Sequence, residues 1–351
     1  MYILLAILIF SVLIVVHELG HFIAAKACGV QVNEFSVFMG PKLLQKKGKE
    51  TTYTLRLIPI GGFCAMEGED ETSENPRDFT AAKPWKRIVI LAAGSFMNFL
   101  TGLVILLCIY ASAQGFAVPV IDSFFENCPY ESAEGFQAGD RFYSVDGRRV
   151  HLYSDLEMLL SRNPDQVYDI VVLRDGEKVT LHDFELKKVP YETEEGTEER
   201  YGFYFGSVPA TFGNQLKNAW YHGIDFARMV WMSLGDLVSG QVSVREMSGP
   251  VGIVSVISET GETAESTKAG VENVLYLGAF IAVNLAVMNM LPIPALDGGR
   301  VFFLLITCLL EAILKKKIDP KYEGYIHAVG MILLLGFMLL ITFKDVWQLL
   351  R

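Results

Sequence analysis

The sequence has few charged residues. Asp, Glu, Lys and Arg make up 20% of its 351 residues, whereas hydrophobic residues make up 51%. Typical soluble domains carry about 25% charged residues. The hydrophobic residues here are clustered in a few long runs, so they do not simply form a large soluble core. This distribution predicts a membrane protein whose main partner is the lipid bilayer.

Two further absences narrow the functional class. The chain has no basic segment interleaved with aromatic residues, and its formal net charge is −10, so nucleic acid is not expected as a partner. Its cysteines form no Cys-x-x-Cys pair, which excludes a disulfide framework and a thiolate metal site. The five cysteines are Cys28, Cys64, Cys108, Cys128 and Cys308.

The long hydrophobic runs predict about four transmembrane helices. The runs cover residues 2–27, 88–113, 271–291 and 326–343. The first run lacks the basic start and the small-residue cleavage site of a signal peptide, so we expect it to span the membrane. After the third run the helix is interrupted by Pro292 and Pro294, and apolar residues resume at 301–314.

The distribution of lysine and arginine predicts the orientation. The loop 26–87 contains ten of these residues, and four lysines lie between 315 and 321. Cytoplasmic loops are the ones enriched in Lys and Arg. We therefore expect both loops in the cytoplasm, with the side of the membrane helices that carries His17, Glu18 and His21 toward it. The N-terminus, residues 114–270 and the C-terminus are then extracytoplasmic, in a multi-pass protein of the cell membrane.

The aromatic-rich stretch 211–240 resembles a fifth span but carries four charges. Lys217, Asp225, Arg228 and Asp236 would be costly at the centre of a bilayer. We predict an amphipathic helix that lies on the outer membrane surface.

Two regions between the spans have the patterns of folded soluble structure. In the loop of about 28–87, β-forming residues at 34–44 and 51–58 predict a hairpin. Outside, short strands and one helix predict a small α/β module. The strands are expected at 117–121, 141–145, 168–173 and 178–185, and the helix at 153–162. The predicted segments are therefore 1–115, 116–190, 191–270 (a linker with the interfacial helix) and 271–351.

The most specific motif lies inside the first span. It reads His17-Glu18-Leu19-Gly20-His21, and residues i and i+4 of a helix share one face. Both imidazoles can therefore bind one Zn²⁺, while Glu18 acts as general base toward a water molecule. Three ionisable side chains in an apolar segment are expensive and indicate function.

A catalytic zinc site needs a third protein ligand, and Asp297 is the best candidate. It follows the interrupted third span, where irregular backbone survives only if it is buried in protein or lines a wet cavity. The alternative is that Asp297 serves as the N-cap of a helix at 298–313. His327, in the last span, is expected to be a buried polar residue near the interface rather than a ligand.

These residues resemble the site-2 protease family of intramembrane zinc metalloproteases, of the bacterial regulator-of-sigma-factor type with a single PDZ domain. The resemblance covers nearly the whole chain: a zinc-motif span, a second span, a PDZ domain and a span with Asn-x-x-Pro-x-Pro-x-Leu-Asp-Gly. That last motif runs here from Asn289 to Gly298, and Gly139-Asp140-Arg141 matches the PDZ pattern. Pro59-Ile-Gly-Gly-Phe63 is similar to the family's membrane-associated cytoplasmic β-loop.

The resemblance implies a fold and a set of roles. The fold is an α-helical polytopic membrane protein with an inserted extracytoplasmic α/β PDZ-like domain and a cytoplasmic membrane-associated β-hairpin. His17, His21 and Asp297 are implied as zinc ligands, Glu18 as the base, and Asn289 and Asn98 as substrate-binding residues. In the second span, Ser95 replaces the proline of the family pattern Gly-Pro-x-x-Asn, so a proline kink is not expected there.

The implied activity is hydrolysis of peptide bonds within transmembrane segments. Its substrates would be single-pass membrane proteins that have already been trimmed, such as anti-sigma factors, or remnant signal peptides, and the PDZ-like domain could bind a peptide. Two alternatives remain open from the residues: a membrane zinc transporter or binding protein, and a non-catalytic PDZ scaffold. The first leaves Glu18 without a role, and the second leaves the complete ligand set unexplained.

Overall fold

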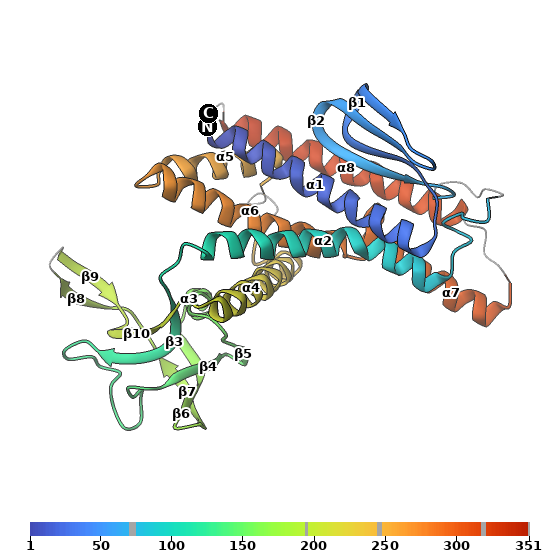
Figure 1. Cartoon of the computed structure of the whole chain (residues 1–351). Coiled ribbons are helices and arrows are strands. Elements are labelled where there is room, and N and C mark those ends of the chain that lie inside the picture. The colour runs from blue at the N-terminus through green and yellow to red at the C-terminus, as the bar shows by residue number, and fades with distance from the viewer. Residues whose placement is uncertain (70–74, 194–195, 244–247, 317–320, 350–351) are drawn as a thin grey trace. The chain divides into compact units, whose positions relative to one another are not determined.

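The computed structural model divides into two compact units (Figure 1). Unit 1 comprises Met1–Ile109 and Phe226–Arg351, and unit 2 comprises Tyr110–Asp225. Part of the lysine-rich loop at 315–321 lies outside the described residues. The residues that the structure describes are 1–69, 75–193, 196–243, 248–316 and 321–349.

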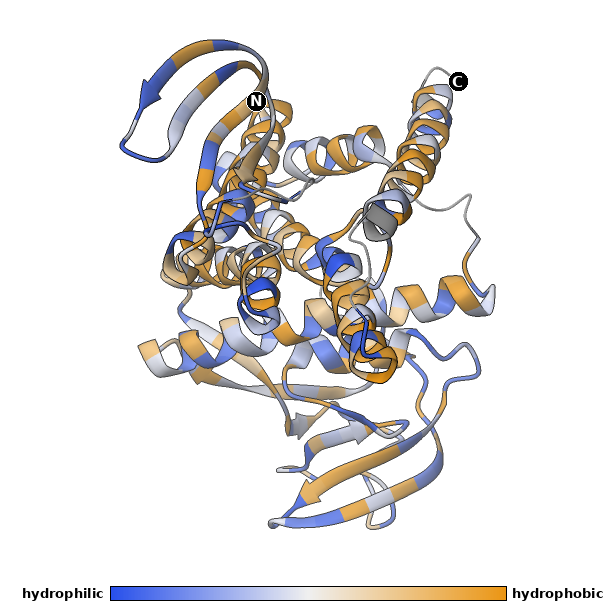
Figure 2. Cartoon of the chain, turned by 90° about the vertical axis from the view of Figure 1, so that its right-hand side faces the viewer, coloured by the Kyte–Doolittle hydropathy of each residue, from blue (hydrophilic) through white to orange (hydrophobic). Residues whose placement is uncertain are grey.

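Unit 1 is built around long apolar helices, which confirms the prediction of a polytopic membrane protein. Within the described residues, four helices are long and apolar enough to cross a membrane. They are α1 (Tyr2–Cys28), α2 (Pro84–Tyr110), α6 (Thr267–Asn289) and α8 (Lys321–Leu349). Hydrophobic residues follow these helices along their length (Figure 2).

The interruption after the third span is also confirmed. Helix α6 ends at Asn289, and α7 (Asp297–Leu314) begins after a connector formed by residues 290–296. Pro292 and Pro294 lie between them, where a proline cannot donate a helix hydrogen bond. The short connector therefore delivers Asp297 to the first turn of a new helix.

Helix α5 (Pro250–Glu262) joins the N-terminal half of α1 and α6 in one apolar core. Its first turn is held by Asp345 near the end of α8. The Oδ2 atom of Asp345 accepts hydrogen bonds from the backbone N–H groups of Gly249 (2.8 Å) and Gly252 (2.9 Å). These N–H groups have no partner within the helix, so the carboxylate stabilises the helix start.

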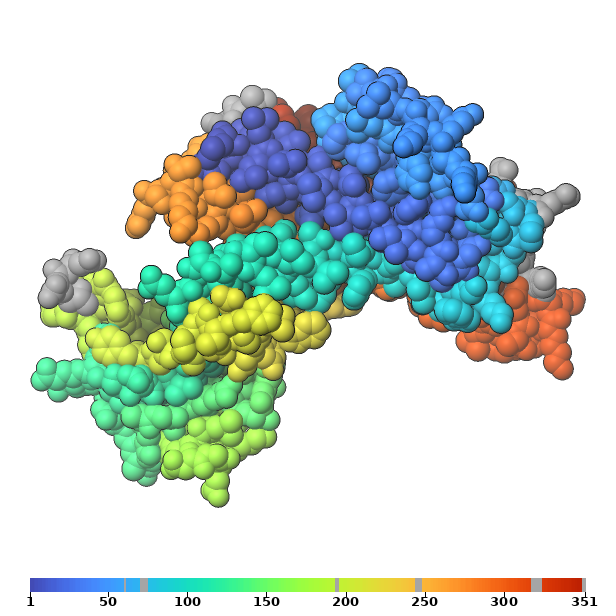
Figure 3. All heavy atoms as spheres, in the orientation of Figure 1, coloured from blue at the N-terminus to red at the C-terminus, as the bar shows by residue number. Residues whose placement is uncertain are grey.

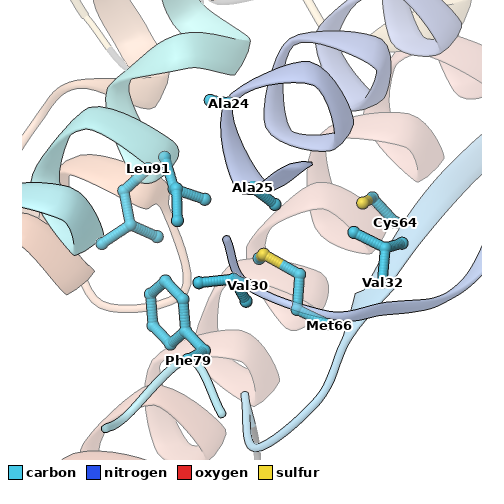
Figure 4. Close-up of a cluster of buried hydrophobic side chains, with 9 residues drawn as sticks. Ala24, Ala25, Val30, Val32, Cys64, Met66, Phe79 and Leu91 are labelled. Atoms are coloured by element: carbon cyan, nitrogen blue, oxygen red, sulfur yellow. The ribbon is translucent and has the colours of Figure 1, made fainter. Parts of the chain in front are cut away.

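A second core lies at the other end of α1, where β1 (Val32–Lys47) and β2 (Thr52–Met66) pack against the membrane helices. Figure 4 shows its side chains, which come from α1, α2 and both strands, together with Val30 and Phe79. In the space-filling view the two strands form part of the surface of unit 1 next to α1 (Figure 3).

The predicted hairpin in this loop is confirmed, but its pairing is more elaborate than two strands side by side. Residues 52–55 face both Leu44–Lys47 and Glu34–Val37 of β1. Residues 62–65 pair with β1 on one side, through Val37–Gly62 and Glu34–Ala65. The segment 52–55 is therefore internal, and the open edges are the later half of β1 and the end of β2.

Unit 2 contains the predicted strands and helix, and its sheet continues beyond residue 190. The sheet order is β10-β3-β4-β6-β7, with β5 paired to β4, and α3 (Tyr153–Ser161) covers it. Aromatic and aliphatic side chains such as Phe136, Phe142 and Ile170 form its core. The strands are β3 (Gly115–Phe124), β4 (Arg141–Val145), β5 (Arg148–Arg149), β6 (Val167–Arg174), β7 (Glu177–Glu185) and β10 (Phe203–Pro209).

The predicted linker 191–270 is largely folded. A separate hairpin, β8 (Val189–Thr193) with β9 (Gly196–Arg200), precedes β10. Helix α4 (Phe212–Ser239) then covers the stretch that was predicted as an amphipathic helix.

Candidate metal centre

His17 and His21 lie one turn apart on α1, as their spacing predicts. Their Nε2 atoms are 3.1 Å apart, and the rings stand nearly perpendicular, at 87°, with centroids 4.7 Å apart. Two imidazoles that project from one helix face at this distance can share one ion.

Asp297 brings a third potential ligand atom, a carboxylate oxygen, to the same point. Its Oδ2 atom lies 3.1 Å from Nε2 of His17 and 3.3 Å from Nε2 of His21. The N-cap of α7 is Leu296, and Asp297 is the first helical residue, so its carboxylate is directed to the histidines instead of capping the helix. The positive end of the α7 dipole favours a carboxylate at this position.

The mutual distances fit a zinc ion. A tetrahedral site with zinc–ligand bonds of 2.0–2.1 Å has ligand atoms about 3.3–3.4 Å apart. The three ligand atoms here are 3.1–3.3 Å apart. Two imidazoles and a carboxylate are also a ligand set that zinc uses in catalytic sites.

Helix α2 orients both imidazoles through their other ring nitrogens. The Nδ1 atom of His21 lies 2.8 Å from the carbonyl oxygen of Ile90, to which it donates. The Nδ1 atom of His17 lies 3.3 Å from the side-chain amide of Asn98, which is 1% exposed. The contact with the Ile90 carbonyl fixes the tautomer of His21 that leaves Nε2 free for a metal. The contact of His17 is with Nδ2 of Asn98 and locates its ring beside α2.

Gly94 makes this approach of α2 possible. A Cβ atom added at Gly94 would lie 2.5 Å from Nε2 of His21 and 2.7 Å from Cε1 of His17. A side chain there would occupy the space at which the ligands meet. The next residue, Ser95, lies within a helix that runs without interruption from Pro84 to Tyr110, as the missing family proline predicts.

Glu18 follows the first histidine and is half-buried. On its side of α1 runs the segment 59–63 of β2. The Oγ atom of Ser11 donates to the Pro59 carbonyl (2.8 Å), and a Cβ added at Gly62 would lie 3.7 Å from Cγ of Glu18. An extended strand therefore lies next to the glutamate.

Comparisons with known proteins identify the family. The model of peptidase family M50 matches residues 5–337. A candidate zinc metalloprotease of Clostridium perfringens is 36% identical, with 99% of this chain and 98% of that protein covered. The zinc metalloprotease RasP of Bacillus licheniformis is 30% identical, with 98% of each covered. The regulator of sigma-W protease RasP of Bacillus subtilis is 29% identical, with 98% and 97% covered.

The chain belongs to peptidase family M50. It is an intramembrane metalloprotease, and zinc is its cofactor. Both agree with the ligand geometry and with the candidate membrane spans of unit 1.

The two asparagines that were predicted to bind substrate differ in their surroundings in this M50 peptidase. Asn289 is the last residue of α6, is half-buried, and makes no side-chain hydrogen bond to another described residue. Asn98 already contacts His17. A role in substrate binding stays a prediction for both.

Contacts around Asp297 were not indicated by the sequence. Arg300, one turn further along α7, forms an ion pair with Glu69 at the end of the β-loop. In the connector, the Ala295 N–H donates to Nδ1 of His327 (3.1 Å), and Ala295 has a φ of 81°. This left-handed conformation costs a non-glycine residue about 1–2 kcal/mol. Backbone contacts of this kind have no sequence signature.

A second group of potential ligands lies in unit 2. One atom each of His151, Asp155 and Asp225 can be chosen so that all lie within 4.8 Å of one another. The Oδ2 atom of Asp155, however, accepts hydrogen bonds from the backbone N–H groups of His151 (2.6 Å) and Leu152 (3.1 Å). The ring of His151 stacks on Tyr221 at 4.5 Å. Asp155 therefore caps the start of α3.

Proposed function

We propose that this M50 peptidase cleaves transmembrane segments of single-pass membrane proteins that another protease has already trimmed. His17, His21 and Asp297 hold the zinc, and Glu18 is the general base. The observation that carries the proposal is the convergence of three ligand atoms to within 3.1–3.3 Å beside the apolar helix α1. The sigma-W regulatory relative supports anti-sigma factors as the substrate class, and remnant signal peptides have the same topology.

The reaction is hydrolysis of one peptide bond. Bound zinc polarises the scissile carbonyl and makes water more acidic. Glu18 accepts a proton from the attacking water as the new C–O bond forms, and returns it to the leaving amine nitrogen as the C–N bond breaks. The amide of Asn289 donates to the scissile carbonyl oxygen, since no described residue accepts from it.

A transmembrane helix hides its carbonyls in hydrogen bonds, so the substrate must become extended before cleavage. An exposed strand edge can hold it by strand addition. Within the hairpin of residues 34–58, however, residues 52–55 are paired on both sides and have no free edge. We therefore assign the role to residues 61–65, whose edge is open and whose Gly62 is beside Glu18.

A photo-crosslinking residue can test this assignment. Placed at Phe63 in a Glu18→Gln background, it should crosslink to the transmembrane segment of the substrate. The matched control is the same group at Leu43, on the other open part of the sheet, which should crosslink much less. Equal crosslinking at both positions, or none at Phe63, would remove residues 61–65 from substrate binding.

Unit 2 acts as a PDZ-like filter in this proposal. A groove of about 1130 Å³ is lined by α3 and by residues of β10, including Tyr153, Leu156, Phe203 and Phe205. A groove between a helix and a strand can take an extended peptide. Because β10 pairs with β3, a clean deletion removes 115–209. That deletion should admit untrimmed substrates, and continued exclusion of them would refute the filter.

The proposed orientation places loops 28–87 and 315–321 in the cytoplasm, and unit 2 and both termini outside. Helix α4 lies on the outer surface, where its exposed Phe212, Leu216, Trp220 and Trp231 contact lipid. Single cysteines at Gly48 and Gly176, in a cysteine-free background, test this in intact cells. An impermeant maleimide should label only the cysteine at position 176; labelling at 48 would invert the topology.

The deciding experiment uses purified protein in detergent and a model substrate trimmed outside the membrane. Wild type should cleave within the spanning segment, whereas Glu18→Gln should keep its zinc and not cleave. If wild type binds zinc and cleaves none of a panel of trimmed helices, the proposed substrate class is wrong; if Glu18→Gln still cleaves, Glu18 is not the base.

A further inference from the structure

Most described side chains of helix α8 are exposed, and the buried or half-buried ones gather mainly at two places where the helix packs against the rest of unit 1. Its C-terminal half is attached to α5 through Asp345. Its N-terminal half lies against the connector between α6 and α7, which carries Asp297. Only 6% of its most apolar window is buried, so most of the helix is available to lipid. The contact with the connector is thus one of the few places where this helix packs against protein.

His327 makes the polar part of that contact. Its Nδ1 atom accepts a hydrogen bond from the Ala295 N–H (3.1 Å), so the ring carries its proton on Nε2. The ring also packs edge-on against Phe303 of α7, at 5.5 Å and 84°. Hydrogen bond and ring contact together fix the imidazole between α7 and the connector.

The backbone that His327 holds is unusual. Ala295 has a φ of 81°, a conformation that residues with a Cβ atom rarely adopt. Asp297 follows two residues later, and its Oδ2 atom must stay within about 3.3 Å of both histidines. A conformation of this kind persists only when the surrounding structure enforces it.

Gly330 makes the apolar part of the contact, one turn after His327. A Cβ atom added there would collide with the Cβ of Pro294 and lie 3.0 Å from the Pro294 carbonyl carbon and oxygen. By contrast, a Cβ added at Gly336 of the same helix would meet nothing within 4 Å. The close approach is therefore local to the connector.

We propose that His327 is a positioning residue for the metal centre: through the Ala295 N–H it holds the connector in the conformation that directs Asp297 to the zinc. The last membrane helix thereby becomes part of the support of the site. The inference rests on the proposed function only in taking Asp297 as a ligand.

The first test compares His327→Leu with His327→Asn in the full-length protein in detergent. Leucine removes the acceptor at similar size, whereas the Oδ1 of asparagine occupies a place close to that of Nδ1. Zinc affinity is measured by competition with a chelator. We expect His327→Leu to weaken zinc binding about 10–100-fold, as for loss of other groups that support metal ligands. His327→Asn should stay within about threefold of wild type, and excess zinc should restore cleavage by His327→Leu.

A second pair covers the case in which His327→Leu does not fold. Gly330→Ala should weaken zinc binding because the new methyl group displaces Pro294 and the connector. Gly336→Ala is the matched control: it is the same change in the same helix, and it should leave zinc affinity unchanged.

Wild-type zinc affinity in a folded His327→Leu protein overturns the proposal, as does an equal loss in His327→Asn. If His327→Leu does not fold, wild-type affinity in Gly330→Ala overturns it. Asp297→Asn separates this inference from the proposed function. If Asp297→Asn loses zinc while His327→Leu keeps it, only the positioning role is wrong. If Asp297→Asn keeps its zinc, the ligand assignment itself is wrong, and the positioning role fails with it.

Discussion

Two groups of histidine and aspartate side chains in this protein have similar composition. They differ in how their ligand atoms are spaced and in whether backbone groups already bind those atoms. His17, His21 and Asp297 direct three ligand atoms at one point, 3.1–3.3 Å apart. In the group of His151, Asp155 and Asp225, Nδ1 of His151 lies 3.6 Å from Oδ2 of Asp155, and that oxygen is already bonded to backbone N–H groups. Residue type alone therefore does not make a metal site. The ligand atoms must also lie close together and must not already be hydrogen-bonded to the backbone.

The largest expected difference between the two groups is in zinc content. Asp297→Ala should lose both zinc and cleavage, with an effect larger than the about 10–100-fold typical of losing a supporting residue. Asp155→Ala should keep wild-type zinc and lower the stability of unit 2 by about 1–2 kcal/mol, because the start of α3 loses its cap. Metal analysis and thermal unfolding of both variants measure this. Zinc loss in Asp155→Ala would contradict the distinction between the two groups.

Gly94→Ala tests the space between the ligands without removing any of them. The added Cβ would lie 2.5 Å from Nε2 of His21, so zinc should not bind and cleavage should fall to background. Alanine favours a helix over glycine by about 1 kcal/mol, so the protein should remain folded. Gly235→Ala in α4, whose Cβ meets nothing within 4 Å, is the control. Normal zinc content in Gly94→Ala would mean that α2 is farther from the histidines.

Asn98 allows the two interpretations of its role to be separated. If its amide orients His17, Asn98→Ala should weaken zinc binding about 10–100-fold, and Asn98→Asp should retain it because a carboxylate oxygen can accept from the Nδ1–H of a zinc-bound His17. If it binds substrate instead, zinc affinity should be unchanged and KM should rise. Chelator competition and cleavage kinetics on the same samples distinguish these outcomes.

The smallest expected effect is a pH dependence confined to unit 2. Burial lowers the pKa of His222, which contacts the hydroxyl of Tyr110 (2.9 Å) and Ser154 (3.3 Å). The unfolded chain then binds a proton more readily than the folded one, so stability should fall as the pH drops below about 6.5. The protection factors of peptides from 141–174, measured by hydrogen exchange and corrected for the intrinsic exchange rate at each pH, should fall between pH 7 and pH 5. His222→Gln should flatten the profile; an unchanged profile would assign it to other groups.

The agreement between sequence and structure follows the range of the interactions. The His17–His21 pair depends on helix periodicity alone, and the break before Asp297 depends on two prolines, so both were predictable. The strands of unit 2 were placed from local alternation and turns. The pairing of β10 with β3 and the double pairing of residues 52–55 depend on contacts between separate segments of the chain. No local sequence pattern predicts them.

By itself the sequence determined the membrane class, the chemistry and the candidate ligands, because hydropathy, helix spacing and ligand type are properties of short segments. Only the tertiary structure decided how the ligands are held. The Ile90 carbonyl, the absent side chain of Gly94 and the imidazole of His327 support the site from two other helices. Every residue has a carbonyl group, so the sequence does not show which one will bind His21. The sequence also does not show where a missing side chain leaves room for the ligands. Their roles appear only when helix packing brings them to the same place.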